Sequence, residues 1–200
     1  MSLGRAGDVR RQRKPGESGA TAVEAAIVTP LVMALLFGII ELGFLFKDYL
    51  AAAGAVRAGV RMASANPRTS TFAQDAVNHV ALTGGAMNLN DVKELWVYKV
   101  DPANPAKDTP VGVGDFSGCN VCVKFRWDVG TKLFVSTYDG WSADDQNACS
   151  SSSNGGPPDR IGVYIELEHL AFTGLVFDTI TISEASIMRL EPMSSLAGCS

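Results

Sequence analysis

The fold is decided by the stretch Gly19-Ala20-Thr21-Ala22-Val23-Glu24, which places a lone carboxylate at the entrance to a long apolar run. Residues 25–46 are apolar apart from Thr29 and Glu41. About 20 such residues, at roughly 1.5 Å each, are enough to cross a bilayer as a helix. The sequence therefore predicts a single membrane-spanning helix that begins near Ala20. A cleavable secretory signal has a shorter apolar core, so we do not expect the whole segment to be removed.

A basic leader precedes this helix and predicts its orientation. Residues 1–19 hold five basic and two acidic side chains, a net charge of +3, and basic residues are retained on the cytoplasmic side of a membrane. The total charge of −4 therefore leaves −7 for the exported residues after Gly19. This acidic balance argues against nucleic-acid binding, which needs basic side chains to displace counterions. The basic residues of the leader are Arg5, Arg10, Arg11, Arg13 and Lys14.

Glu24 needs a partner, because an ionised carboxylate at the start of a membrane span is costly. If the chain were cut between Gly19 and Ala20, the new amino group of Ala20 would lie one helical turn before Glu24, within reach of a charge pair. A neighbouring subunit is a second source of such an amine. The alternative is an uncleaved signal anchor in which the Glu24 side chain turns back toward the lipid headgroups. These residues alone are compatible with both interpretations.

The helical pattern continues beyond the membrane as far as Asn66-Pro67, so we expect one helix over residues 20–65. Pro30 removes a backbone hydrogen bond and is expected to bend this helix. Glu41 lies seventeen residues after Glu24, roughly 25 Å along the axis, near the far membrane interface. We expect its side chain to reach the headgroups, with a contact to another subunit as the alternative.

The outer half of this helix is rich in alanine and glycine. Gly54 with Ala58, or Ala55 with Gly59, lie one turn apart on a face where another backbone can come close. Such a face either packs under the domain's own sheet or contacts another subunit, and the residues favour neither.

Residues 66–200 are expected to form one small extracytoplasmic domain. A short helix should begin after Thr71 and end at Gly84-Gly85. Four strands are expected over residues 94–100, 120–129, 161–170 and 179–190, with a polar loop over 140–158. The predicted fold class is α+β, with the long N-terminal helix packed on a small antiparallel sheet of about four strands.

The cysteines follow the membrane segment, in a compartment where disulfides persist: they are Cys119, Cys122, Cys149 and Cys199. If Cys119 and Cys122 both lie in extended chain, their α-carbons are about 10 Å apart, too far for a mutual bond. We therefore expect one bridge from this pair to Cys149, closing a loop of about thirty residues worth roughly 3 kcal/mol, and a second to Cys199. A thiol redox motif would need a helix N-terminus, whereas a strand is expected here.

No catalytic, metal or cofactor site is expected. His79 and His169 are isolated in the sequence, and Ser142 has no neighbouring base. The aspartates between residues 139 and 159 do not have the spacing of a calcium-binding loop. A zinc site would need a second paired motif beside Cys119 and Cys122. We therefore do not expect an enzyme.

Several segments resemble TadE-like proteins, which are pseudopilins of the tight-adherence (Flp) pilus. The N-terminal ones are residues 19–24, the run Phe37-Gly38-Ile39-Ile40-Glu41-Leu42-Gly43, and residues 55–63; residues 185–191 resemble the family's closing strand. The resemblance implies a pilin-like fold, cleavage after Gly19 by a prepilin peptidase, and retention in the bacterial inner membrane with the N-terminus in the cytoplasm. Ala25 stands where many prepilins of the wider type IV class carry an aromatic residue, a departure that weakens a classical type IV assignment more than a tight-adherence one.

The expected function is therefore that of a structural, minor pilin subunit that assembles through its N-terminal helix, with Glu24 neutralising a terminal amine. The resemblance implies a prepilin peptidase, other pilins, the assembly platform and membrane lipid as partners. Pro30, Glu41, Gly54 and Ala58 are candidate helix contacts. The alternatives are an uncleaved signal-anchored binding domain, a type II secretion pseudopilin and a thiol oxidoreductase.

Overall fold

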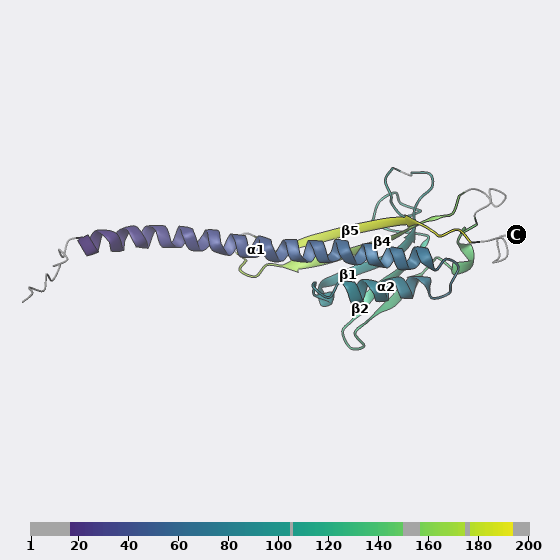
Figure 1. The fold of residues 1–200 in the computed structure, drawn as a ribbon, viewed down its shortest axis with the longest axis horizontal. Helices are drawn as coiled ribbons and strands as arrows, with labels where there is room; N and C mark the ends of the chain where they lie inside the picture. Colours follow the sequence, from purple (N-terminus) through teal and green to yellow (C-terminus); the bar gives the residue numbers. More distant parts are fainter. Residues whose placement is uncertain (1–16, 105, 150–156, 175–176, 194–200) are drawn as a thin grey trace, which may run out of the picture.

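The computed structural model describes residues 17–104, 106–149, 157–174 and 177–193. It consists of a long helical stalk that ends in a small α+β domain (Figure 1). The basic leader up to residue 16 and Cys199 lie outside the described residues, so the predictions made for them stay predictions.

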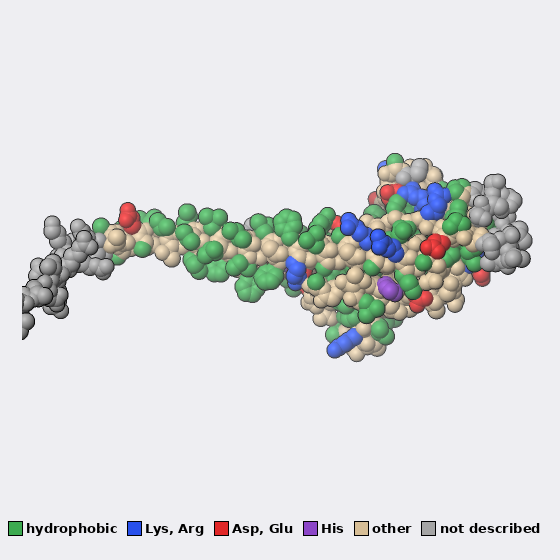
Figure 2. All heavy atoms as spheres, in the orientation of Figure 1, with side chains coloured by type: hydrophobic (Ala, Val, Ile, Leu, Met, Phe, Trp, Pro, Cys, Tyr) green, Lys and Arg blue, Asp and Glu red, His purple; other side chains and the backbone are tan. Residues whose placement is uncertain are grey.

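The stalk is the first half of helix α1, Glu17–Ala65, which confirms the predicted long N-terminal helix. The helix contains Pro30 and continues through it. Every residue from 19 to 36 is exposed, and hydrophobic side chains cover the stalk on the face that Figure 2 shows. By length and composition this helix is able to cross a membrane. Because it is apolar on all sides, it fits a lipid or multi-helix environment better than a one-sided protein core.

The domain is built on an antiparallel sheet with the strand order β3-β2-β1-β4-β5. This confirms the predicted fold class, with five strands where about four were expected. The additional strand is β3, whose side chains are exposed apart from Phe134, so it lacks the apolar alternation that marks a strand in sequence. The strands are β1 Val92–Lys99, β2 Cys122–Asp128, β3 Leu133–Asp139, β4 Arg160–Leu170 and β5 Thr179–Arg189.

Helix α2, Phe72–Thr83, lies beside the outer half of α1 on one face of the sheet (Figure 1). Thr71 precedes it as predicted, although its hydroxyl donates to the Asp75 carboxylate, 2.7 Å away, rather than capping a backbone amide. Two short 3-10 helices, η1 Leu89–Asp91 and η2 Ala143–Asp145, lie in the connections. The main core lies between the two helices and the inner face of β1, β2 and β4, and includes Val56, Val60, Val77, Val80, Leu95, Val97, Ile161, Val163 and Ile165.

The opposite face of the sheet carries a second, aromatic cluster under the connection between β1 and β2. Phe116 from this connection stacks on Tyr164 with ring centroids 4.3 Å apart, and Trp96 lies 5.1 Å from Tyr164. The Lys124 ammonium lies 4.0 Å from the centroid of the Trp96 ring. This cluster fixes the connection on the sheet by apolar and cation–π contacts.

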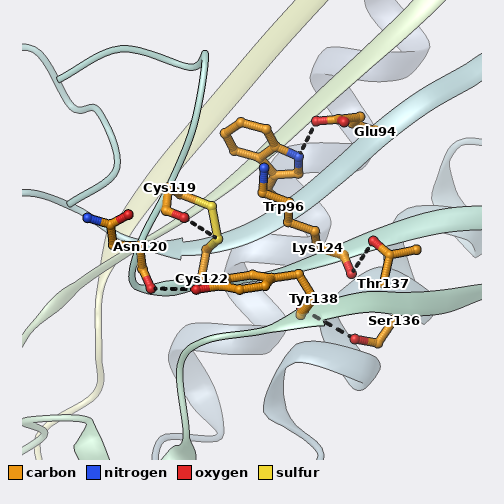
Figure 3. The surroundings of a disulfide bond; sticks show 9 residues. All are labelled: Glu94, Trp96, Cys119, Asn120, Cys122, Lys124, Ser136, Thr137 and Tyr138. Atoms are coloured by element: carbon orange, nitrogen blue, oxygen red, sulfur yellow. Dashed lines mark hydrogen bonds between the residues drawn. A yellow bond between two sulfur atoms is a disulfide. The ribbon is translucent and has the colours of Figure 1, made fainter. Parts of the chain in front are cut away.

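A disulfide joins Cys119 to Cys122 and closes this connection (Figure 3). The predicted bridge from this pair to Cys149 is therefore wrong. The two α-carbons are 6.0 Å apart, because the chain bends at Asn120 and Val121 and only Cys122 belongs to β2. The Tyr138 hydroxyl supports the bend by donating to the carbonyl of Asn120, 3.2 Å away. Cys149 is disulfide-bonded as well.

The Cys119–Cys122 bridge is buried at the start of a strand, which is not the helix N-terminus that a reactive thiol pair requires. Because it closes only a very short loop, we expect it to stabilise the domain by about 2 kcal/mol, less than a thirty-residue loop. Replacing both cysteines by alanine should therefore lower the melting temperature of the full chain in detergent by roughly 5 °C. The measurement is thermal unfolding followed by near-UV circular dichroism.

Peptide mapping without reduction gives the control for this prediction. We expect a single peptide that carries both Cys119 and Cys122 and lacks two hydrogens. A peptide in which either residue is joined to Cys149 would contradict the pairing.

Candidate functional site

The N-terminal end of α1 contains the predicted processing and assembly residues. Gly19, Ala20 and Glu24 are all helical and exposed. Ala20 and Glu24 are four residues apart, so their side chains project from the same face of the helix. Glu24 forms no ion pair with any of the described residues. The Glu24 carboxylate is therefore available to pair with a cation from outside the described part of the subunit.

The apolar surface of α1 is the largest uncovered apolar surface among the described residues. It includes Val23, Ile27, Leu31, Leu35 and Ile39, each more than half exposed. These residues recur every four positions along the helix. Because they are exposed, this face of the helix does not pack against the described part of the subunit. Pro30 is exposed on the same stretch. Such a surface is suited to lipid or to the helices of other subunits.

Glu41 occupies a different environment from the one predicted. Its side chain is buried within its own chain, with 1% of the residue exposed. The carboxylate accepts hydrogen bonds from the backbone amides of Phe172 and Thr173, at 2.8 and 3.0 Å, and from the Thr173 hydroxyl at 2.8 Å. The expected headgroup contact is therefore corrected, whereas the alternative of a contact with another subunit stays a prediction. The β4–β5 connection provides the donors because it folds back along α1.

A second acidic residue of α1 makes a parallel contact two helical turns later. The Asp48 carboxylate lies 2.7 Å from Nδ1 of His169, which is buried at the end of β4. Lys47 also lies 3.2 Å from Asp48. His169 was expected to be an ordinary strand residue, because its partner is 121 residues away and no local pattern links the two. Together Glu41 and Asp48 fix the orientation of α1 relative to β4 and the β4–β5 connection.

The Glu41 contact gives a direct prediction. Replacing Glu41 by leucine removes the acceptor of two backbone amides, which should then exchange with solvent roughly tenfold faster or more. Hydrogen exchange of the full chain, resolved at Phe172 and Thr173, measures this effect. Glu41→Gln keeps one acceptor oxygen and should show a smaller increase. Unchanged exchange in the leucine variant would contradict the contact.

The two small-residue faces of α1 have different surroundings. Ala55 is fully buried, and a Cβ added at Gly59 would lie 2.5 Å from Cγ2 of Val80 in α2. A Cβ added at Gly54 meets nothing within 4 Å. The face of Ala55 and Gly59 is therefore occupied by this domain's own α2, whereas the face of Gly54 and Ala58 is only half-buried.

Chemically reactive groups are not assembled in the part of the chain that the structure describes. No group of three or more His, Cys, Asp and Glu side chains there is placed to hold a metal ion. The Ser142 hydroxyl donates to Asp145, 2.8 Å away, and has no histidine beside it. The surfaces suited to function are those of the helix.

Comparison with known proteins adds one finding. Residues 19–61 match the family model described as TadE-like protein. The match covers about a fifth of the chain, begins at Gly19 and includes Glu24 and Glu41. Comparisons with curated proteins and with solved structures found no match.

Proposed function

We propose, on the premise that this chain is a TadE-like protein over residues 19–61, that it is a pilin-like subunit of a tight-adherence pilus. In this proposal α1 anchors the subunit in the bacterial inner membrane, and the domain after residue 65 lies outside the cytoplasm. The basic leader holds the N-terminus in the cytoplasm. The subunit has a structural role in assembly, with no reaction of its own.

One observation carries this proposal: the family match begins at Gly19 and contains the exposed apolar surface of α1, which includes Val23, Ile27 and Leu31. A prepilin peptidase that cuts between Gly19 and Ala20 would remove the leader and leave the apolar surface at the new N-terminus. The cut would also create an α-amine one turn before Glu24. Processing and assembly would then be linked, because the charge that Glu24 needs appears only after cleavage.

Glu24 supplies the guiding interaction in this mechanism. Its exposed carboxylate has no cation among the described residues, so inside a bilayer it would favour pairing with an α-amine. The amine of Ala20 in the same subunit, or that of a neighbouring subunit, would fill this role. Helix packing along the apolar surface then holds the subunits together, with Pro30 and the face of Gly54 and Ala58 as further contacts.

The partners that follow from this proposal are the prepilin peptidase, other pilins or pseudopilins, the inner-membrane assembly platform and membrane lipid. The net negative charge of the residues after Gly19 argues against nucleic acid as a partner.

The first experiment is to determine the N-terminal residue of the protein purified from its native membrane. Mass spectrometry of the terminal peptide distinguishes the two predicted forms. We expect a chain that starts at Ala20. An intact leader would instead support an uncleaved, signal-anchored extracytoplasmic domain, and it would remove the α-amine from the mechanism.

A further inference from the structure

The β4–β5 connection extends beyond the rest of the domain along the stalk, toward the N-terminal half of α1 (Figure 1). Its position along the helix is fixed by hydrogen bonds, because the amides of Phe172 and Thr173 both donate to Glu41. Glu41 lies five residues before the end of the apolar run at residue 46, a rise of roughly 7.5 Å along the helix axis. If α1 spans a membrane over residues 25–46, this connection therefore lies at the depth of the interface and not above it.

The start of this connection exposes a large apolar side chain, whereas Asp178 at its other end is exposed and acidic. Phe172 is 73% exposed, and Leu170 beside it is also exposed. The ring centroids of Phe172 and Phe44 are 6.1 Å apart, so the connection and α1 form one uncovered aromatic surface. This surface continues the exposed apolar surface of the stalk. Most of the Phe172 ring remains uncovered by the subunit, and such a ring is favourable among lipid acyl chains.

Three successive backbone amides at the start of the connection have hydrogen-bond partners that suit this environment. Irregular backbone is tolerated at membrane depth only where its polar groups have partners. The amides of Phe172 and Thr173 are bonded to Glu41, and the amide of Ala171 donates to the carbonyl of Asp178, 3.0 Å away. In return the Glu41 carboxylate, which is costly near lipid, receives three donors. These hydrogen bonds lower the free-energy cost of removing both the amides and the Glu41 carboxylate from water.

The residue that directly follows the apolar run on α1 is of a type common at membrane interfaces. Lys47 is half exposed, and its ammonium lies 5.7 Å from the centroid of the Phe44 ring. A lysine just outside an apolar run reaches the headgroups while its methylenes cover apolar surface. The Phe44 and Phe172 rings therefore lie on the lipid side of a basic residue.

We infer that residues 170–173, where β4 passes into the β4–β5 connection, are a second membrane contact of this protein, with Phe172 inserted among the acyl chains of the extracytoplasmic leaflet beside α1. The partner is the bilayer itself. This inference rests on the proposed membrane anchorage of α1 and adds that the domain is held against the lipid surface at two points. The domain then has one fixed side toward the membrane.

Tryptophan fluorescence with brominated lipids tests this inference. The full chain is reconstituted in phosphatidylcholine vesicles with plain or acyl-brominated chains, and quenching by bromine is compared among Phe172→Trp, Leu35→Trp and Val113→Trp variants. Bromine on the acyl chains quenches only tryptophans that reach the hydrocarbon. The native tryptophans, Trp96, Trp127 and Trp141, are common to all variants, so the wild-type protein provides their background.

The two control positions are matched to Phe172 in exposure. Leu35 is 61% exposed within the predicted span, and Val113 is 59% exposed in the β1–β2 connection. Val113 lies at the opposite end of the sheet. The amide of nearby Val111 donates to the carbonyl of Lys99, and Lys99 pairs with Ile161 at the start of β4. The β4–β5 connection, by contrast, follows the end of β4. The Phe172→Trp change replaces one exposed aromatic ring by another, so it should not impair folding, and an unchanged melting temperature checks this.

We expect the added fluorescence at positions 172 and 35 to be quenched and that at position 113 to be unaffected. Quenching at position 35 with none at position 172 would overturn the inference and leave the membrane anchor intact. If neither position is quenched, the anchorage of α1 is wrong, and the inference fails with it.

Discussion

Replacing Glu24 by glutamine should reduce the number of surface pili by roughly tenfold while leaving the protein in the membrane. The glutamine cannot neutralise an α-amine. An unpaired charge costs about 3 kcal/mol at the centre of a bilayer and less at the entrance, where Glu24 lies, so we expect a cost of about 1.4 kcal/mol, which corresponds to a tenfold change in an equilibrium. Glutamine is as long as glutamate and helix-compatible, so α1 itself should be unaffected.

The measurement is a count of pili per cell by electron microscopy, in a strain whose only copy of the gene carries the substitution. An immunoblot of the membrane fraction shows whether insertion is preserved. Glu191→Gln is the matched control, because Glu191 is an exposed glutamate in the domain far from the N-terminus of α1. Normal pilus numbers in the Glu24 variant would remove this residue from the mechanism.

Replacing Gly59 by leucine should destabilise the domain by about 3 kcal/mol, because overpacking of a dense core forces backbone and side chains apart. A Cβ at position 59 would lie 2.5 Å from Cγ2 of Val80 and 3.1 Å from the carbonyl oxygen of Ala76. The second of these contacts is with backbone and cannot be relieved by a rotamer change. The expected fall in melting temperature is therefore roughly 10 °C.

Gly54→Leu provides the matched control on the same helix. A side chain at position 54 has open space, and leucine is a better helix former than glycine, so stability should stay within about 1 kcal/mol of the wild type. Thermal unfolding of both variants in detergent compares the two positions. Equal melting temperatures would mean that α2 does not pack on Gly59. If the Gly54 variant is stable yet reduces pilus numbers, the face of Gly54 and Ala58 is a contact between subunits.

The elements of the fold were predictable where local pattern and burial agree. The end of α1 near Asn66-Pro67 follows from the helix-breaking proline, and β2 follows from alternation, with Val123 and Phe125 buried and Arg126 exposed. Strand β3 was not predictable in this way, since it is an edge strand with one buried side chain and carries no apolar alternation.

The long-range contacts of the candidate site were not predictable from sequence, because no local pattern determines them. Glu41 and Asp48 contact residues more than 120 positions away, and only the course of the β4–β5 connection brings them together. The Cys119–Cys122 bond was missed for a related reason. The prediction assumed extended chain at both residues, whereas the bend at Asn120 and Val121 brings their α-carbons together.

The burial of Glu41 has a consequence for how copies of the subunit recognise one another. The apolar run contains one carboxylate at its entrance and one near its exit, and the second is already satisfied by Phe172 and Thr173 of its own chain. Glu41 therefore needs no charged partner from a neighbouring subunit, at whatever axial position that subunit packs. In the proposed assembly, Glu24 is then the one carboxylate of the apolar run that distinguishes correct from shifted stacking, so a charge at one end of the span would set the stagger between adjacent copies.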